Sequence, residues 1–311
     1  MKEMIDFRKY PILKPLDKEL KEYMGGVTLD YILSTDNQIK REAERRVDKI
    51  LRGEELNPYG KEAVKIFYTT LYLVVALDNE ILKKKFVEKE TELMEKSLMK
   101  ENDDTLLEIA RILSTKYQEL SDLRNESLKI KRKERRKTLI FTFKFSMNFI
   151  NYLKVTKGLR KEDEDFSLSG RILKDGRVFL TNTDVARILA YEIRDMLYEA
   201  VNIRYESVPE EVKKMADEMK GKKTPPCILS LMKKKELKET EKAVLIVYLI
   251  DIGDYRDAEK ISEELAKRFL GDRKNKYIVY SCGKMKGLGL CVENCGTLNP
   301  LQHYYGKALR L

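Results

Sequence analysis

Leu139-Ile-Phe-Thr-Phe-Lys-Phe145 interrupts a chain that otherwise reads as helical. Aromatic and β-branched residues dominate this stretch, which is the composition of a β-strand. A second β signal follows, because residues 167–173 and 177–180 flank a Lys174-Asp175-Gly176 turn. Asp-Gly between two apolar runs is typical of a β-hairpin. We therefore predict a small β element near residues 139–180.

The segments on either side of this element carry helical patterns. Apolar residues recur at helical spacing up to about residue 128, and residues 62–77 are apolar on most faces, as in a central core helix. Downstream, residues 183–201 are amphipathic and residues 243–252 are apolar. The predicted fold class is mainly α (α+β), with the β element inserted between helical regions.

A dense basic run, KIKRKERRK, occupies residues 129–137. It holds seven basic residues and one acidic residue. Runs of this kind contact nucleic acid in some proteins and are solvated helix ends in more of them. We interpret the run as a helix end, and contact with nucleic acid stays open as the alternative.

The length of 311 residues suggests two domains. Ser207-Val208-Pro209 ends the amphipathic region, and the polar, charged stretch that follows runs to about residue 223. We predict a helical N-terminal domain with the β subdomain over residues 1–207, a linker over 208–223, and a helical C-terminal domain over 224–311.

The charge of the chain is unevenly distributed. Of the net +10, residues 221–311 carry +7, from 18 Lys and Arg against 11 Asp and Glu, whereas residues 1–220 carry +3. A basic patch is the electrostatic footprint of a phosphate-rich partner. The alternative is a Lys-rich surface that serves solubility alone.

Several classes of enzyme lack their motifs here. The only Asp-x-Asp, Asp163-Glu164-Asp165, stands in a charged loop, and the sequence has neither a Walker A motif nor Gly-x-Ser-x-Gly. A single histidine, His303, has no nucleophile partner. We expect no catalytic residues in this chain. The apolar stretches are too short for a membrane span and the first residues do not resemble a signal peptide, so we expect a soluble, intracellular (cytoplasmic) protein.

Four cysteines stand in the last 85 residues as Cys227-x54-Cys282-x8-Cys291-x3-Cys295. Thiolates are the ligands of zinc and of iron–sulfur clusters, both of which take four. Structural zinc sites usually have two short knuckles, and here only Cys291 and Cys295 are close in sequence. We favour an iron–sulfur cluster, with zinc or unrelated buried cysteines as alternatives.

The flanks of these cysteines follow a recognisable order. They are Pro225-Pro226-Cys227-Ile228, Tyr280-Ser281-Cys282, Gly289-Leu290-Cys291, and Asn299-Pro300-Leu301-Gln302-His303-Tyr304-Tyr305. The set resembles the C-terminal domain of the large subunit of archaeal and eukaryotic DNA primase, with the compact archaeal form most similar. Gln302-His303 makes the tail one residue longer than the family's Pro-Leu-x-Tyr-Tyr. The roles of His303, Tyr304 and Tyr305 therefore stay open.

The resemblance covers nearly the whole chain. Tyr10-Pro11-Ile12-Leu13 resembles the family's opening motif, and Asn151-Tyr152-Leu153-Lys154 with the hairpin after it resembles the middle region. This resemblance implies a noncatalytic subunit of a heterodimer, whose small subunit carries the polymerase carboxylates and is bound by the N-terminal domain. It also implies a C-terminal [4Fe–4S] domain, held by the four cysteines, that helps bind template DNA and nucleotides when an RNA primer is started for DNA replication.

Lys238 and Lys242 are candidates for binding nucleotide or template phosphates. They are four residues apart at the start of the apolar helix over residues 243–252, so they share a helix face near the positive end of the helix dipole. They also stand where the resemblance places basic residues that act in initiation. The alternative is a solvated helix start in which Glu236, Glu239 and Glu241 pair with the lysines.

Two rival functions remain at this point. One is a zinc-stapled nucleic-acid-binding module with no polymerase partner. The other is a free-standing iron–sulfur redox enzyme, although the sequence shows no motif for a substrate or cofactor pocket. A visible spectrum separates a brown cluster protein from a colourless zinc protein.

Overall fold

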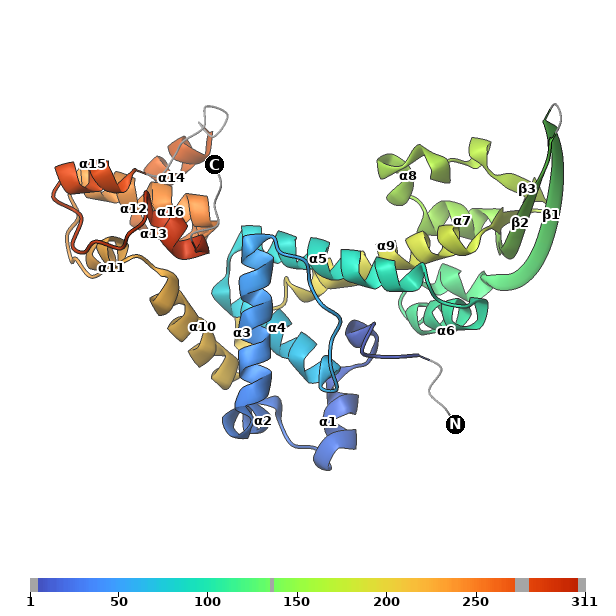
Figure 1. Ribbon diagram of the computed structural model, residues 1–311, viewed down its shortest axis with the longest axis horizontal. Helices are drawn as coiled ribbons and strands as arrows, with labels where there is room; N and C mark the ends of the chain where they lie inside the picture. Colours follow the sequence, from blue (N-terminus) through green and yellow to red (C-terminus); the bar gives the residue numbers. More distant parts are fainter. Residues whose placement is uncertain (1–4, 135–136, 272–279, 307–311) are drawn as a thin grey trace. The chain divides into compact units, whose positions relative to one another are not determined.

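The structure is a computed structural model that describes residues 5–134, 137–271 and 280–306. It is mainly helical with one antiparallel sheet, which confirms the predicted fold class (Figure 1). The helices are α1 (Leu16–Met24), α2 (Leu29–Thr35), α3 (Asn37–Arg52), α4 (Ala63–Leu77), α5 (Glu80–Leu98), α6 (Asp103–Leu113), α7 (Phe149–Val155), α8 (Leu159–Glu162), α9 (Asn182–Ala200), α10 (Glu210–Lys223), α11 (Pro226–Met232), α12 (Glu239–Ile252), α13 (Tyr255–Ile261), α14 (Glu263–Gly271), α15 (Cys282–Gly287) and α16 (Pro300–Tyr305). Five short 3-10 helices are η1 (Pro11–Leu13), η2 (Gln118–Asp122), η3 (Glu164–Phe166), η4 (Leu168–Gly170) and η5 (Tyr205–Ser207), and the strands are β1 (Arg124–Glu134), β2 (Lys137–Asn148), β3 (Ile172–Lys174) and β4 (Arg177–Leu180).

The sheet has the strand order β1-β2-β4-β3, and every neighbouring pair is antiparallel. The predicted hairpin is confirmed as β3–β4. Its turn has positive φ at Asp175 (50°) and Gly176 (71°), as a type I′ turn requires. Its first strand is shorter than predicted, because Leu168–Gly170 forms η4. Helices α7 and α9 pack against β2 and β4, and α6 packs against β1 (Figure 1).

The basic run was misread as a helix end. Residues 129–134 of the run belong to β1, Lys137 begins β2, and residues 135–136 lie outside the described residues. Strand β1 pairs with β2 from Arg124 opposite Ser146 to Glu134 opposite Lys137, with a register irregularity between Asn125 and Leu128. The helical reading up to residue 128 is also wrong for the residues that follow Leu123. The strand exists because β2 supplies its hydrogen-bonding partners, which is information that local periodicity does not contain.

Helix α4 is the predicted central helix. Residues on several of its faces are buried, among them Phe67, Leu73 and Val74, each 0 % exposed. Lys65 on the same helix is only 1 % exposed, and its Nζ lies 3.2 Å from the ring centroid of Tyr23. An ammonium over an aromatic face keeps a favourable electrostatic partner after it leaves water.

The chain forms two compact units that alternate along the sequence. The first comprises Met1–Glu22, Asn57–Val64 and Val87–Ala200, and contains the sheet. The second comprises Tyr23–Leu56, Lys65–Phe86 and Val201–Leu311, and contains all four cysteines. The stretch interpreted as a linker forms α10, a 14-residue helix. The division into 1–207, 208–223 and 224–311 stays a prediction.

After its charged first turn, helix α12 is apolar on most sides, and its C-cap residue Gly253 adopts φ +88°. A Cβ at Gly253 would meet Asn79 Oδ1 at 2.8 Å, so only glycine fits the close approach of the α4–α5 turn. Asn79 Nδ2 donates to the Ile252 carbonyl, and the Glu80 N–H donates to the Gly253 carbonyl (3.2 Å). Across the described residues, we find no helix that combines the length and apolarity needed to cross a membrane.

Candidate metal centre

Cys227 is placed by a short helix with a proline start. Pro225 and Pro226 occupy the N-cap and first position of α11, where a missing N–H costs nothing. Cys227 is 7 % exposed, and Ile228 and Leu231 on the same helix are also buried. The apolar packing of α11 therefore fixes this thiol inside the second unit.

Cys282 is held in place by hydrogen bonds at the start of α15. It begins α15, whose N-cap residue Ser281 accepts a hydrogen bond from the Lys284 N–H (3.2 Å). The Cys282 N–H donates to the Leu298 carbonyl (2.8 Å), and its Sγ lies 3.8 Å from Thr297 Oγ1. These contacts join the start of α15 to the segment just before α16.

Cys291 and Cys295 lie on the loop between α15 and α16. Their Sγ atoms lie 3.4 and 3.6 Å from the same atom, the Glu293 carbonyl oxygen, so the two sulfurs are neighbours. Positive φ at Gly289 (69°) and Gly296 (63°) reverses the chain on each side of the pair.

The four thiols interact electrostatically with one another. Burial raises the pKa of Cys227 to about 11, and the other three cysteines oppose its ionisation further. The pKa of Cys295 is also raised, first by burial and then by Glu293, Cys282 and Cys291. Because the charge of nearby thiolates disfavours ionisation of Cys227 and Cys295, a bound cation would compensate that charge.

The donor set fits a four-thiolate centre by its chemistry. A single zinc ion would need sulfurs about 3.8 Å apart, since its tetrahedral Zn–S bonds are about 2.3 Å long. Among residues 5–134, 137–271 and 280–306, no three Cys, His, Asp or Glu side chains are gathered closely enough for one ion. In a [4Fe–4S] cluster each cysteine binds its own iron, so the sulfurs stand farther apart. Four thiolates are the ligand set of a zinc ion and of a [4Fe–4S] cluster alike, so the residues present fit either group.

The three residues whose roles the sequence left open make structural contacts. Tyr304 is buried, and its hydroxyl accepts from Asn79 Nδ2 (3.3 Å). His303 Nδ1 lies 3.0 Å from the Lys223 carbonyl oxygen, and the Tyr305 hydroxyl donates to the Asp251 carbonyl (3.4 Å). All three side chains therefore anchor α16 to the second unit.

Lys238 and Lys242 occupy the start of α12, as predicted. Lys238 is the exposed N-cap residue, and its N–H donates to Glu241 Oε2 (3.0 Å). Lys242 Nζ lies 2.8 Å from Glu239 Oε1, so this lysine has the carboxylate partner that the alternative interpretation expects. Glu241 is further paired with Lys234 (2.7 Å). Lys234 and Lys242 therefore both have a carboxylate that offsets their charge at this helix start.

The Asp-x-Asp sequence makes local structural contacts. Asp163 accepts the Asp165 N–H (2.9 Å) at the start of η3 and also pairs with Arg187. These contacts hold the loop before the β3–β4 hairpin.

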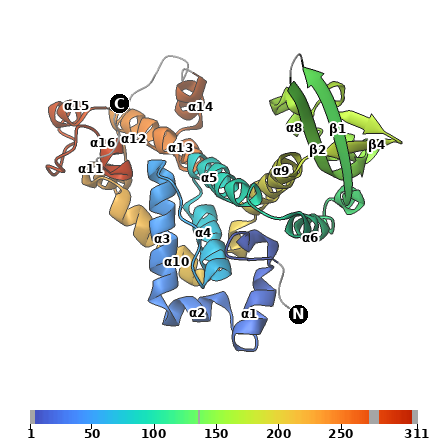
Figure 2. The same cartoon turned by 45° about the vertical axis from the view of Figure 1, so that its right-hand side comes forward.

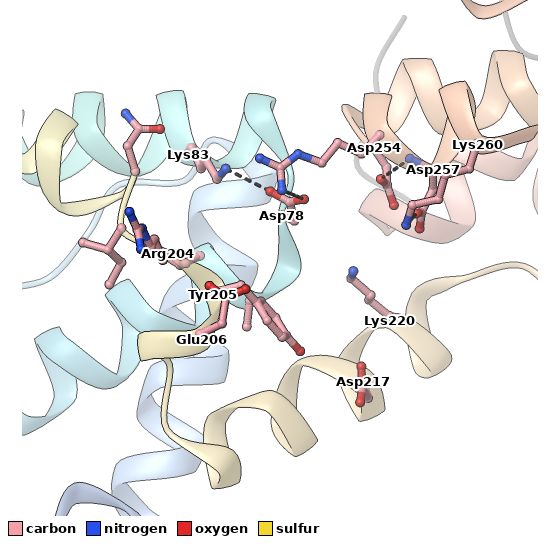
Figure 3. A pocket seen from close by; sticks show the side chains of 15 residues that line it. Asp78, Lys83, Arg204, Tyr205, Glu206, Asp217, Lys220, Asp254, Asp257 and Lys260 are labelled. Carbon is pink, nitrogen blue, oxygen red and sulfur yellow. Dashed lines mark hydrogen bonds and ion pairs between the residues drawn. The ribbon is translucent and has the colours of Figure 1, made fainter. Parts of the chain in front are cut away.

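A cavity of about 500 Å³ lies in the second unit, between the turn after α4, η5, α10 and α13 (Figure 3). Five basic and five acidic side chains line it. Asp78 accepts both Lys83 Nζ (3.0 Å) and Arg256 Nη1 (3.1 Å), and Lys260 pairs with Asp257 (2.6 Å). Its walls are electrically balanced, so the cavity offers phosphate no excess of positive charge.

Asp254 is the most perturbed carboxylate in this cavity. It caps α13 by accepting the Asp257 N–H (3.4 Å) and is 9 % exposed. Burial raises the pKa of Asp254 to about 6; the Asp257 charge adds to this shift and Lys220 opposes it. The cavity therefore becomes more positive as the pH falls through about 6.

Comparison with known families decides the identity of the chain. The model of the eukaryotic and archaeal DNA primase large subunit N-terminal domain matches residues 8–210. The chain belongs to this family. It therefore acts in DNA primase, and so in DNA replication. The match ends before Cys227, so the large subunit's cysteine segment lies outside it. A search of curated proteins finds no match to the chain.

Proposed function

We propose that this protein is the regulatory, noncatalytic large subunit of an archaeal-type DNA primase heterodimer. It binds and stabilises the catalytic small subunit, holds a [4Fe–4S] cluster through Cys227, Cys282, Cys291 and Cys295, and supports initiation of RNA primers by binding template DNA and nucleotides inside the cell. The match of residues 8–210 to the large-subunit family carries this proposal. The proximity of the other three cysteines to Cys227, which adds to burial in raising the pKa of that thiol, supports a shared metal centre.

A bound cluster would supply a covalent tie between the start and the end of the cysteine segment. Three elements of the chain place the four cysteine donors. Helix α11 buries one donor, α15 begins on the second, and the loop before α16 brings the other two together. The contacts of Tyr304 and His303 hold α16, and thereby this loop, in place.

The surface for the small subunit is proposed on the first unit, at the start of α7 and on β3. The Phe149 N–H donates to the Gly176 carbonyl (3.0 Å), which places the start of α7 beside the β3–β4 turn. Ile150 is 51 % exposed and Leu173, on the edge strand β3, is 56 % exposed. Exposed apolar side chains beside an unpaired strand edge are typical of a protein interface.

Replacing Ile150 and Leu173 by Asp in the full-length chain should abolish co-elution with the catalytic small subunit in size-exclusion chromatography. Two charges would have to be desolvated at the contact, which costs several kcal/mol. The matched control is Tyr31→Asp, a similarly exposed apolar residue (56 %) of the second unit, which should still co-elute. Co-elution of the Ile150/Leu173 variant would move the interface elsewhere, and separate elution of the wild-type subunits would contradict the proposed function.

Lys238→Glu together with Lys242→Glu should impair formation of the first dinucleotide by the assembled heterodimer. Two cations that hold phosphates would become anions, while extension of a supplied primer should continue because the small subunit holds the polymerase chemistry. The salt dependence of template binding should also weaken, by roughly one unit of log–log slope per lost phosphate contact. The control is Lys267→Glu with Arg268→Glu, an equal charge change on exposed residues of α14. Wild-type initiation in the Lys238/Lys242 variant would exclude these two lysines from the site.

A further inference from the structure

The β1–β2 hairpin extends beyond the rest of the sheet as a two-stranded ribbon. Strand β2 pairs with β4 only over its last four residues, from Phe145 opposite Leu180 to Asn148 opposite Arg177. Its pairing with β1 continues outward to Lys137 opposite Glu134 (Figure 2). A two-stranded ribbon in water is only marginally stable by itself. Its length therefore suggests that a partner contacts it.

Lysines alternate along one face of this ribbon. Lys129 stands opposite Thr142, and Lys131 stands opposite Ile140. Both lysines are exposed, and Ile140 of β2, the partner of Lys131, is 60 % exposed. Within the part of the chain that the structure describes, neither lysine has a carboxylate at ion-pair distance. Their charges are therefore available to an external partner.

The opposite face of the ribbon is also open to solvent. Ile130 stands opposite Phe141, whose side chain is 45 % exposed. Among the described positions of the outer ribbon, Lys129, Lys131, Ile140 and Phe141 are all exposed. The ribbon therefore presents two free faces and can enter a groove.

The chemistry of the ribbon fits nucleic acid better than protein. The run over residues 129–137 has seven basic residues and one acidic residue. Lysine is depleted from protein–protein interfaces, whereas interfaces with nucleic acid are strongly positive. Alternate residues of a strand are about 6.8 Å apart, which is twice the 3.4 Å axial spacing of phosphates along one DNA strand. A two-stranded ribbon also matches the width of the DNA major groove.

We infer that the β1–β2 ribbon is a nucleic-acid-binding arm, in which Lys129 and Lys131 hold the phosphate backbone of duplex DNA. This site lies on the first unit and is distinct from Lys238 and Lys242 on the second. We take the natural ligand of the arm to be the base-paired part of the template, and this step rests on the proposed function. The two lysines contact the phosphate backbone and not the base edges, so binding is independent of base sequence.

The test compares full-length wild-type protein with Lys129→Gln/Lys131→Gln by fluorescence anisotropy on a labelled DNA duplex of mixed sequence, between 50 and 200 mM salt. Each lost phosphate contact removes about 0.9 from the log–log salt slope, so the slope should fall by about two. Over this fourfold range of salt, wild-type affinity should drop roughly tenfold more than that of the variant. Lys129→Arg/Lys131→Arg keeps the charges and should keep the wild-type slope.

The matched control is Lys157→Gln/Lys161→Gln, which removes two charges from exposed lysines on the same unit away from the ribbon. It should bind as the wild type does. Equal slopes for the ribbon variant and wild type would overturn the inference. So would loss of small-subunit co-elution with unchanged duplex binding, because the ribbon would then be a protein contact. The proposed function is tested separately, by wild-type co-elution and iron content, neither of which requires the ribbon.

Discussion

Cys227→Ser should reduce bound iron from about four atoms per chain, the content of one [4Fe–4S] cluster, to well below one after anaerobic purification. Fifty-four residues separate Cys227 from Cys282, so its ligation closes the longest loop in the centre. In a chain-entropy account, a cross-link across a loop of this length contributes about 4 kcal/mol to stability. The thermal unfolding temperature of the second unit should fall together with the absorbance near 400 nm.

The matched control for Cys227→Ser is Ile228→Val, which removes one buried methyl group from the neighbouring residue and leaves all donors in place. It should cost roughly 0.5–1.5 kcal/mol and retain full iron. Stoichiometric zinc without sulfide in the wild type would end the cluster hypothesis. Full iron in Cys227→Ser would show that this thiol is not a ligand.

Glu192→Gln should stabilise the protein by a few kcal/mol at pH 8.5 and have little effect at pH 5. Glu192 on α9 is 5 % exposed. Burial raises the pKa of Glu192 from 4.5 to about 8; the charges of Asp195 and Glu119 add to this shift, and Lys116 opposes it. Each pKa unit corresponds to about 1.4 kcal/mol.

The sign of this pH effect follows from proton binding. Between about pH 4.5 and 8 the folded state holds a proton on Glu192 that the unfolded state releases, so stability falls as the pH rises through this range. Glutamine has the same shape and never ionises, so it avoids this loss. Thermal melts of both proteins at pH 5 and 8.5 measure the difference.

The control for Glu192→Gln is Glu199→Gln, an exposed position on the same helix that pairs with Lys116. A surface ion pair is worth at most about 1 kcal/mol, so this change should be small. A Glu192→Gln variant that melts with the wild type at pH 8.5 would show that Glu192 is not buried as a neutral acid.

Local chemistry explains which elements were predictable from sequence. The Asp175-Gly176 turn specifies its own backbone angles, so β3–β4 could be predicted without tertiary information. Helices α4 and α12 were predictable because their apolar content is high on most sides. Strand β1 was not, because its lysines and arginines have no strong strand preference and its partner β2 provides the pairing.

The four cysteines could be proposed as metal ligands from the sequence, but their environment could not be predicted from it. The spacing of the cysteines and their flanks named the four donors. It did not show that Cys227 would be buried or that Cys291 and Cys295 would share one carbonyl neighbour. The contact of Asn79 with Tyr304 could not be predicted from the sequence either, because it joins residues 225 positions apart.

Because the two units alternate along the chain, the second unit can be completed only late in synthesis. Residues 23–56 and 65–86 leave the ribosome early, but their unit is completed only by residues after 200. Helix α10 then docks on α2, where the Glu211 N–H donates to Asp30 Oδ1 (2.9 Å), and Lys40 of α3 also pairs with Glu211 (2.9 Å). At about 5–20 residues per second, the intervening 114 residues delay this step by roughly 6–23 s. During that interval α2 lacks its contact with α10, so the second unit cannot complete its packing before residues 210–223 have been synthesised.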